Sequence, residues 1–293
     1  MAVLTQLFTG ISFGAVLLLV ALGLVLTFGQ MNVINMAHGE LIMAGAYTVY
    51  MLQKVVTSAG ASLLVALPVA FVVSGLLGLA MEMLLLRRLY HRPLDTLLVT
   101  WGLSLVLQQA ARDLFGAPNK QTAAPEWLTG AVEVGALTLP ASRLFILAVA
   151  VVAVGGLSVA LTATSLGRRI RAVVQNRNLA ATSGIPTARV DRTTFFIGSG
   201  LAGVAGVALT LLGAIGPSMG TSYIVDAFLV VVAGGVGRIQ GAVVMAFVIG
   251  MLNALLEYQV GASVAKVLVF VAVVLFIQWR PQGLFTLRTR SLA

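Results

Sequence analysis

The sequence predicts an all-α fold, a polytopic transmembrane helical bundle of about eight or nine hydrophobic segments, with short or broken helices near residues 29–56 and 224–237. Of the 293 residues, 59% are hydrophobic and only 9% are charged, whereas a soluble domain carries about 25% charged residues. The apolar residues also gather in blocks, and a helix needs roughly 20 residues to cross a bilayer. So few polar residues cannot coat that many apolar blocks in water, and the blocks are expected to face lipid and one another.

The apolar blocks follow one another along the whole chain, which is expected to form a single transmembrane domain of residues 1–293. In chain order they cover about 7–28, 41–56, 63–86, 94–114, 144–164, 194–215, 224–236, 242–256 and 264–279. The second and seventh blocks are short, and each adjoins a polar or glycine-rich break. Short, interrupted segments in matching halves of a transporter point to a site near the middle of the membrane.

Basic residues gather between or after the apolar blocks. Thirteen of the 18 lie in four places, namely Arg87, Arg88 and Arg92; Arg168, Arg169, Arg171, Arg177, Arg189 and Arg192; Arg238; and Arg280, Arg288 and Arg290. Cytoplasmic loops carry such an excess of Lys and Arg, so the N-terminus is expected outside and the C-terminus inside. The net charge of +9 then reflects topology, no nucleic-acid partner is expected, and the chain is expected to be a multi-pass protein of the inner (cytoplasmic) membrane.

The residue inventory also excludes several kinds of chemistry. With no cysteine and two histidines, a disulfide framework, a thiolate site and a multi-histidine metal site are excluded. The sequence lacks the G-x-x-x-x-G-K-[ST] phosphate loop and any Ser-His-Asp order or paired carboxylates. The chain is therefore expected not to be an enzyme: it has no predicted catalytic residue, metal site or cofactor, and any ATP would act on a partner.

A first polar set interrupts the apolar sequence at Asn32, Asn35, His38 and Glu40. The first three recur every three residues, so they share one face if this stretch is helical. Charged groups inside a membrane usually mark a solute path or a structural pair. Three interpretations stay open: a lining of the path, a buried network in which Glu40 lies at the positive N-terminus of the next helix, or the cytoplasmic membrane surface.

A second polar set recurs every four residues at Thr96, Thr100, Ser104 and Gln108, which places it on one helical face, with Trp101 off that face. Hydroxyl and amide groups on one face can exchange hydrogen bonds with a small polar solute. Ser and Thr in membrane helices also bond back to their own backbone or hold helices together. Path lining and helix packing both remain open.

The sequence of the main cytoplasmic loop, about residues 165–192, indicates a surface that can bind a protein partner. Ile170, Val173, Val174 and Arg177 recur at helical spacing, which indicates a short amphipathic helix, and Gly184 is placed to end it. A helix that offers apolar residues among arginines can dock in a groove of a soluble protein. It can also lie on anionic lipid headgroups.

Three stretches resemble a known family. The loop GRRIRA at 167–172, with Asn176 and Gly184-Ile185, resembles the coupling loop of ABC permeases of the branched-chain amino acid type, the LivH-like family. INMAHGE at 34–40, followed by MAGAY at 43–47, is similar to the N-terminal signature of that family. Within the family, the chain most resembles urea permeases of the UrtB type through RPLDTLLVTWG (92–102), QNRNLAA (175–181) and RPQGLF (280–285).

The resemblance implies a permease subunit that forms half of the translocation pathway of an ABC importer for urea. It implies a heterodimer with a second, UrtC-like permease, two ATP-binding subunits that use ATP, and an extracytoplasmic solute-binding protein. The coupling loop to the ATP-binding subunits would be formed by Gly167, Arg168, Arg169, Arg171, Asn176 and Gly184. The hypothetical solute path would be lined by Asn32, Asn35, His38, Glu40, Thr96, Thr100, Ser104 and Gln108.

Urea suits these polar residues because it is small, neutral and rich in hydrogen-bonding groups. An amino acid would need partners for both a carboxylate and an ammonium group. The first alternative is nevertheless a permease for branched-chain amino acids or another small polar amide. The second alternative is an ATP-independent urea channel, which would not require the 165–192 loop.

Overall fold

The computed structural model describes residues 2–31, 33–90, 92–134 and 137–285. Each of the nine apolar blocks predicted from the sequence forms a helix. In chain order the elements are α1 (Ala2–Met31), α2 (His38–Val55), α3 (Ala59–Leu84), the 3-10 turn η1 (Leu86–Arg88), α4 (Pro93–Phe115), α5 (Glu126–Thr129), β1 (Ala131–Val134), β2 (Leu137–Pro140), α6 (Ala141–Ala163), α7 (Ser165–Gln175), α8 (Arg177–Thr182), α9 (Thr187–Leu209), α10 (Met219–Gly234), α11 (Ile239–Val260) and α12 (Ala262–Trp279).

The helices form the polytopic transmembrane bundle that the composition predicts. Within the described ranges, six helices are long and apolar enough to cross a membrane, namely α1, α3, α6, α9, α11 and α12. The two predicted irregular segments are also present: residues 33–37, between α1 and α2, are not helical, and α10 has only 16 residues. The chain is therefore a multi-pass membrane protein.

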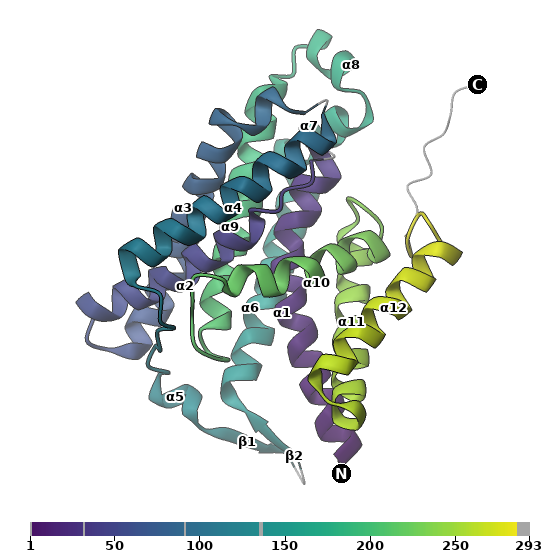
Figure 1. Cartoon of the computed structure of the whole chain (residues 1–293). Coiled ribbons are helices and arrows are strands. Elements are labelled where there is room, and N and C mark those ends of the chain that lie inside the picture. Colours follow the sequence, from purple (N-terminus) through teal and green to yellow (C-terminus); the bar gives the residue numbers. More distant parts are fainter. Residues whose placement is uncertain (1, 32, 91, 135–136, 286–293) are drawn as a thin grey trace.

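The two ends of the bundle differ in character (Figure 1). Helices α7 and α8 lie at one end, whereas the start of α1, helix α5 and the β1–β2 hairpin lie at the other. The hairpin is antiparallel, with Val132 opposite Leu139, and near it Trp127 packs edge-on against Phe145 with ring centroids 5.4 Å apart. The arginine-rich loop and the 115–142 loop thus lie at opposite ends, as the charge distribution predicts.

Helices α1 and α9 form the centre of the bundle. Of their most apolar stretches, 83% and 72% respectively are buried, compared with 17% for α6 and for α12. Leu17, Leu19 and Leu22 of α1 are completely buried. The poorly buried helices α6 and α12 lie at the periphery, where their apolar side chains are available to lipid or to another membrane subunit.

Small residues let α9 approach its neighbours at backbone distance. A Cβ on Gly45 of α2 would lie 2.1 Å from the carbonyl oxygen of Gly203, and one on Gly206 would lie 2.0 Å from that of Ile42. Lipid chains are as apolar as the helices, so close packing of this kind replaces the hydrophobic effect as the main source of helix association in a membrane. Helices α2 and α9 are consequently locked together.

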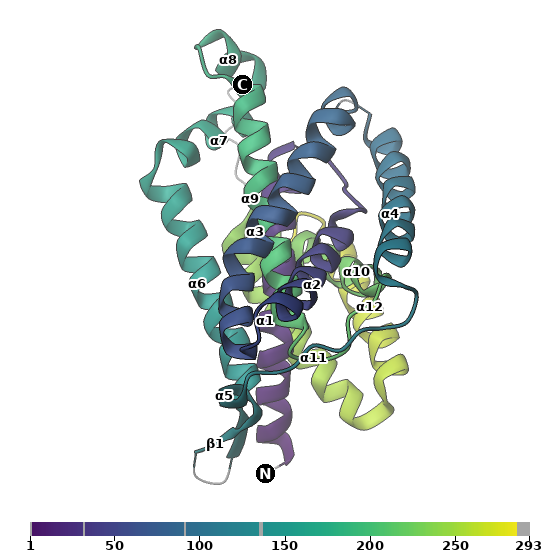
Figure 2. The same ribbon diagram turned by 90° about the vertical axis from the view of Figure 1, so that its left-hand side faces the viewer.

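The two short helices α2 and α10 meet at their N-terminal ends. A Cβ on Gly39 would lie 2.7 Å from the carbonyl oxygen of Gly220, so both positions must be glycine for this contact. Helix α4 lies at the edge of the bundle (Figure 2) and passes next to this contact. The first turns of α2 and α10 and the middle of α4 therefore surround one point.

Candidate solute path and docking loop

A buried carboxylate occupies the point where α2, α4 and α10 meet. Oε1 of Glu40 accepts hydrogen bonds from Oγ of Ser104 at 2.8 Å and from Nε2 of Gln108 at 2.9 Å. The same amide nitrogen lies 3.2 Å from Oγ1 of Thr221. Glu40 is only 2% exposed, yet its second oxygen, Oε2, is buried without a hydrogen-bond partner in the described part of the chain. Such an oxygen is costly to bury, which marks it as a place for a missing donor.

The polar face predicted on α4 is the face that joins this helix to the bundle. Its buried residues are Thr96, Thr100, Ser104, Gln108 and Ala111. The rest of the helix points outward, and Trp101, which was expected off the polar face, is 56% exposed. Helix α4 is therefore attached through hydroxyl and amide groups along this face, and through apolar packing of Ala111 and Phe115 near its C-terminal end.

The two halves of the α4 face have different partners. Oγ1 of Thr96 donates to the carbonyl oxygens of Leu89 and Arg92 at 3.0 and 2.9 Å. Oγ1 of Thr100 accepts from the backbone N–H of Met36 at 3.1 Å. Thr96 and Thr100 thus form hydrogen bonds to the backbone of the α3–α4 connector and of the non-helical segment 33–37, respectively. Ser104 and Gln108 instead donate hydrogen bonds to the Glu40 carboxylate.

The condition under which Asn32, Asn35 and His38 would share a helical face is not met, because residues 33–37 are not helical. Asn32 itself lies outside the described residues. Oδ1 of Asn35 accepts from the backbone N–H of Ala37 at 3.1 Å and so stabilises the turn before α2. The His38 ring is fully buried, with Nε2 3.4 Å from the carbonyl oxygen of Val20 on α1. The structure thus brings Glu40 to the α4 residues, but it turns Asn35 and His38 to local and α1 contacts.

A cavity of about 310 Å³ opens beside the first turn of α10, next to the Glu40 cluster. It is lined in part by Asn119, Gly216, Ser218, Met219, Ser222 and Tyr223. The backbone here is fixed by the antiparallel bridge between Lys120 and Ile215. Thr221, which reaches Gln108, belongs to the same turn of α10 as two of the lining residues. The cavity therefore adjoins the turn of α10 that carries Thr221, although neither Thr221 nor Glu40 is among its lining residues.

The 165–192 loop forms an amphipathic helix, as predicted, but α7 ends at Gln175, Val174 is exposed, and Arg177 belongs to the next helix, α8. Gly167, Ile170 and Val173 of α7 are buried, whereas Arg168, Arg169 and Arg171 are exposed. The buried residues pack with Ala180 and Val190 in a small core of their own. The three arginines are thus on the exposed side of α7, a helix that lies with α8 at one end of the bundle (Figure 1).

Three residues give the loop its shape. A Cβ on Gly167 would lie 1.7 Å from the carbonyl oxygen of Leu161, so α6 and α7 can meet here only at a glycine. Oδ1 of Asn176 accepts from the backbone N–H of Leu179 at 2.9 Å and caps α8. Gly184 has φ +81°, a left-handed conformation that suits glycine and ends the helical stretch as expected.

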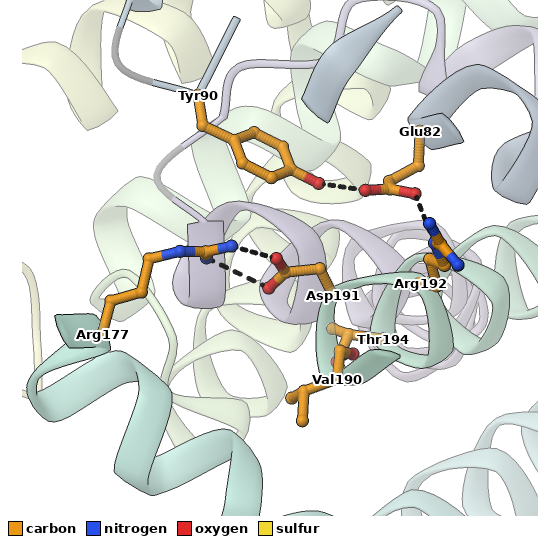
Figure 3. Close-up of polar contacts among 7 residues, drawn as sticks. All are labelled: Glu82, Tyr90, Arg177, Val190, Asp191, Arg192 and Thr194. Carbon is orange, nitrogen blue, oxygen red and sulfur yellow. Dashed lines mark hydrogen bonds and ion pairs between the residues drawn. The ribbon is translucent and has the colours of Figure 1, made fainter. Parts of the chain in front are cut away.

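A cluster of charged residues behind the loop was not identified from the sequence (Figure 3). Arg177 of α8 donates from both terminal nitrogens to the carboxylate of Asp191 on α9, with Nη1 3.2 Å from Oδ1. The hydroxyl of Tyr90 donates to Oε1 of Glu82 at 2.5 Å, and Arg192 forms an ion pair with the same carboxylate at 3.9 Å. Glu82 carried the only usable signal, because an acidic residue in the last turn of an apolar block usually has a specific partner.

The electrostatics of this cluster follow from its contacts. The hydrogen bonds to Asp191 raise the pKa of Arg177 further above its ordinary value. Burial, together with the bond to Glu82, raises the pKa of Tyr90. Both side chains therefore keep their protons throughout the physiological range, so Arg177 stays a cation and Tyr90 stays a hydroxyl donor.

Comparisons with known proteins place the chain among membrane permeases. The family model described as "branched-chain amino acid transport system / permease component" matches residues 6–278. Two relatives are high-affinity branched-chain amino acid transport system permease proteins LivH, 30% identical in Escherichia coli and 29% identical in Salmonella typhimurium, each aligned over 96% of this chain and 94% of its own length. The corresponding protein BraD of Pseudomonas aeruginosa is 28% identical over 96% of this chain and 95% of its own. No solved structure matches.

Proposed function

This chain belongs to the family of permease components of branched-chain amino acid transport systems, and we propose that it forms half of the path through which an ABC importer moves a branched-chain amino acid. It is a membrane subunit and not an enzyme. The observation that carries the proposal is the buried Glu40 carboxylate at the meeting point of α2, α4 and α10. ATP hydrolysis takes place on partner subunits, and the solute passes along the face that α4 turns to the bundle.

The Glu40 site suits the two charged ends of an amino acid. Oε2 of Glu40 is buried and lacks a hydrogen-bond partner among the described residues, so it is free to accept from an ammonium group. The N-termini of α2 and α10 converge beside it, and helix N-termini attract carboxylates. Discontinuous helices of other transporters bind amino-acid carboxylates in the same way.

Urea is the second candidate substrate. It is favoured by the neutral donors and acceptors around Glu40, which are the side chains of Ser104, Gln108 and Thr221. The resemblance to urea permeases rests on three short segments. The relatives at 28–30% identity, which extend over 96% of this chain, bear the name of branched-chain amino acid transport. For this reason a branched-chain amino acid is the leading proposal.

The proposed path begins at the cavity of about 310 Å³ beside α10. A solute released by an extracytoplasmic binding protein would enter there, pass Thr221 and reach Glu40. The exposed apolar face of α4, which includes Leu98, Trp101 and Leu105, is suited to a second permease that completes the path. That second subunit would be UrtC-like if the cargo is urea. Two ATP-binding subunits would dock on the arginines of α7.

Uptake by the whole importer tests this function. The assembly of both permeases and both ATP-binding subunits would be placed in vesicles with ATP inside and the loaded binding protein outside. We expect accumulation of labelled leucine only when ATP is present, and no comparable uptake of labelled urea. ATP-dependent uptake of urea alone would establish the second candidate. Uptake of either solute at the same rate without ATP would remove the importer function and leave a channel.

A further inference from the structure

Five charged or polar side chains behind the docking loop connect four separate segments of the chain. We call this group the cytoplasmic clamp; it consists of Glu82, Tyr90, Arg177, Asp191 and Arg192 (Figure 3). Glu82 belongs to α3, Tyr90 to the α3–α4 connector, Arg177 to α8, and the last two residues to α9. The group therefore joins the loop that is suited to ATP-binding subunits with the helices that enter the membrane.

Burial is unequal within the clamp. The side chains of Asp191 and Glu82 are 1% and 2% exposed, whereas those of Arg177 and Arg192 are 35% and 39% exposed. A buried carboxylate that loses its cation is strongly destabilised. The two carboxylates are therefore the fixed parts of the clamp. The two arginines lie at its rim, where a displacement of the neighbouring loop can reach them first.

Arg177 contacts two parts of the chain, α9 and the α3–α4 connector, and each of them leads to the Glu40 site. Its guanidinium binds Asp191 through two nitrogens, which gives the contact a defined orientation as well as strength. The same group lies over the ring of Tyr90, 5.3 Å from the centroid, a favourable cation–π arrangement. One side chain of α8 thus holds both α9 and the α3–α4 connector.

The first route leads along α9 to α2. Asp191 lies in the second turn of α9, and further along this helix Gly203 is in backbone contact with Gly45 of α2. Packed helices of this kind shift as rigid elements between discrete arrangements. A displacement of the start of α9 therefore moves the helix that carries Glu40.

The second route leads through the connector to α4. Tyr90 neighbours Leu89 and lies two residues before Arg92, and the carbonyl oxygens of both accept hydrogen bonds from Thr96 in the first turn of α4. Helix α4 carries Ser104 and Gln108, the two donors to Glu40. Both helices that build the Glu40 site are thus attached to α8 through the clamp.

We propose that Arg177 is the positioning residue through which movement of the α7–α8 loop is passed jointly to α9 and to the start of α4, so that the Glu40 site changes only when the loop moves. This inference rests on the proposed function as an ATP-driven permease. It goes beyond docking, because it concerns the side chains behind the docking surface. A purely structural role would make the clamp a brace that affects assembly without affecting how much solute is moved per ATP.

Replacement of Arg177 in the complete importer distinguishes a role in transmitting loop movement from a purely structural role. The change Arg177→Ala is compared with Arg189→Ala, which removes the same charge at an exposed position two residues before Asp191. We expect Arg177→Ala to assemble and hydrolyse ATP at a rate within about twofold of the original protein, while leucine taken up per ATP falls by about fivefold or more, the lower end of typical coupling effects. Arg189→Ala should keep the original ratio.

Two milder variants keep the test decisive if Arg177→Ala fails to assemble. Arg177→Lys retains the charge but loses the two-nitrogen contact with Asp191, and should lower uptake per ATP to an intermediate value. Tyr90→Phe retains the ring under Arg177 but loses the bond to Glu82, and should act through the connector route alone. A double variant with Arg177→Lys should fall short of the product of the two single effects, because both act in one network.

The proposal is overturned if the assembled Arg177→Ala or Arg177→Lys importer keeps the original uptake per ATP, or if Arg189→Ala lowers it equally. Failure of the proposed function has a different signature, because the unaltered importer would then show no ATP-dependent uptake at all. The ratio of uptake to hydrolysis, rather than either rate, is the measured quantity.

Discussion

At the scale of single residues, the proposed solute path depends most on the environment of Glu40. Two donors, Ser104 and Gln108, bind one of its oxygens, and the other is buried without a hydrogen-bond partner in the described residues. Oxygens in this state are seldom tolerated unless a ligand or a conformational change completes them. A charged solute nitrogen would complete this one.

Replacing Glu40 by glutamine tests whether the charge is used. Glutamine keeps an acceptor for Ser104 and Gln108 but cannot offer a full charge to an ammonium group. A hydrogen bond to a charged group is worth about 1.5–3 kcal/mol, so we expect kcat/KM for leucine uptake to fall roughly 10- to 100-fold, with folding retained. Asp113→Asn, which removes an exposed carboxylate on α4, is the control and should leave uptake unchanged. Unaltered uptake by Glu40→Gln would remove Glu40 from the path.

The spacing of single residues predicted which of them share a helical face, but not which distant residues they contact. The spacing of Thr96, Thr100, Ser104 and Gln108 predicted a shared face, and the structure buries all four. Periodicity cannot reveal that Glu40 is their partner, because the contact joins residues 64 and 68 positions apart. It also misled at Asn35 and His38, where the chain leaves the helix and the regular spacing loses its meaning.

At the scale of secondary structure, helix α9 holds the bundle together through glycine. It lies against α1, α2 and α3, and at Gly203 and Gly206 only a hydrogen separates it from the backbone of its neighbours. Because of this close packing, a displacement of the N-terminal end of α9 would be transmitted to α2. The close packing also makes the crossing sensitive to one added methyl group.

A pair of glycine substitutions measures this sensitivity. Gly45→Ala would place a Cβ 2.1 Å from the Gly203 carbonyl oxygen, whereas a Cβ on Gly156 of α6 meets nothing within 4 Å. Overpacking costs about 1–3 kcal/mol, so Gly45→Ala should lower the midpoint of thermal unfolding in detergent and the yield of the assembled complex. Gly156→Ala, which makes the same chemical change in another helix, should lower neither. Equal behaviour of the two variants would contradict the close α2–α9 contact.

Helix α7 is the element whose outer surface is proposed to meet the ATP-binding subunits. Its apolar side faces Ala180 and Val190, and its exposed side presents Arg168 and Arg169. Reversal of both charges by Arg168→Glu with Arg169→Glu should reduce copurification of the ATP-binding subunits by about tenfold or more, as expected for the loss of two complementary contacts. The permease itself should fold normally, since both side chains are exposed. Undiminished copurification would assign the docking surface elsewhere.

Sequence patterns predicted the elements well and their contacts poorly. Each apolar block became a helix, and the loop contains an amphipathic helix as expected, although Gly184 follows α8 and not the amphipathic helix α7. These features depend on local chemistry, namely length, hydrophobic spacing and glycine conformation. The cytoplasmic clamp depends instead on which helix ends meet: Glu82 and Asp191 belong to segments more than 100 residues apart, and no local pattern connects them.

At the scale of the whole molecule, two clusters of polar side chains lie in an apolar helical bundle, one in its middle and one at one end. The Glu40 site joins the two short helices to α4, and the clamp joins the docking loop to α9 and the α4 connector. Peripheral helices such as α12 leave apolar surface for lipid or a partner. This arrangement fits the proposal that the molecule is one half of a larger assembly, in which ATP-driven movement is applied at the arginine-bearing end.

The central claim is that α7 faces the cytoplasm and is covered by an ATP-driven partner, and the absence of native cysteines allows a direct measurement. A single Arg169→Cys variant would be treated with a membrane-impermeant maleimide in sealed vesicles of known orientation, with Glu133→Cys in the β1 strand as the matched position at the opposite end. The account predicts labelling of Cys at 169 only from the cytoplasmic side, with protection when the ATP-binding subunits are present, and labelling at 133 only from outside. Labelling of position 169 from outside, or labelling unaffected by the ATP-binding subunits, would contradict it.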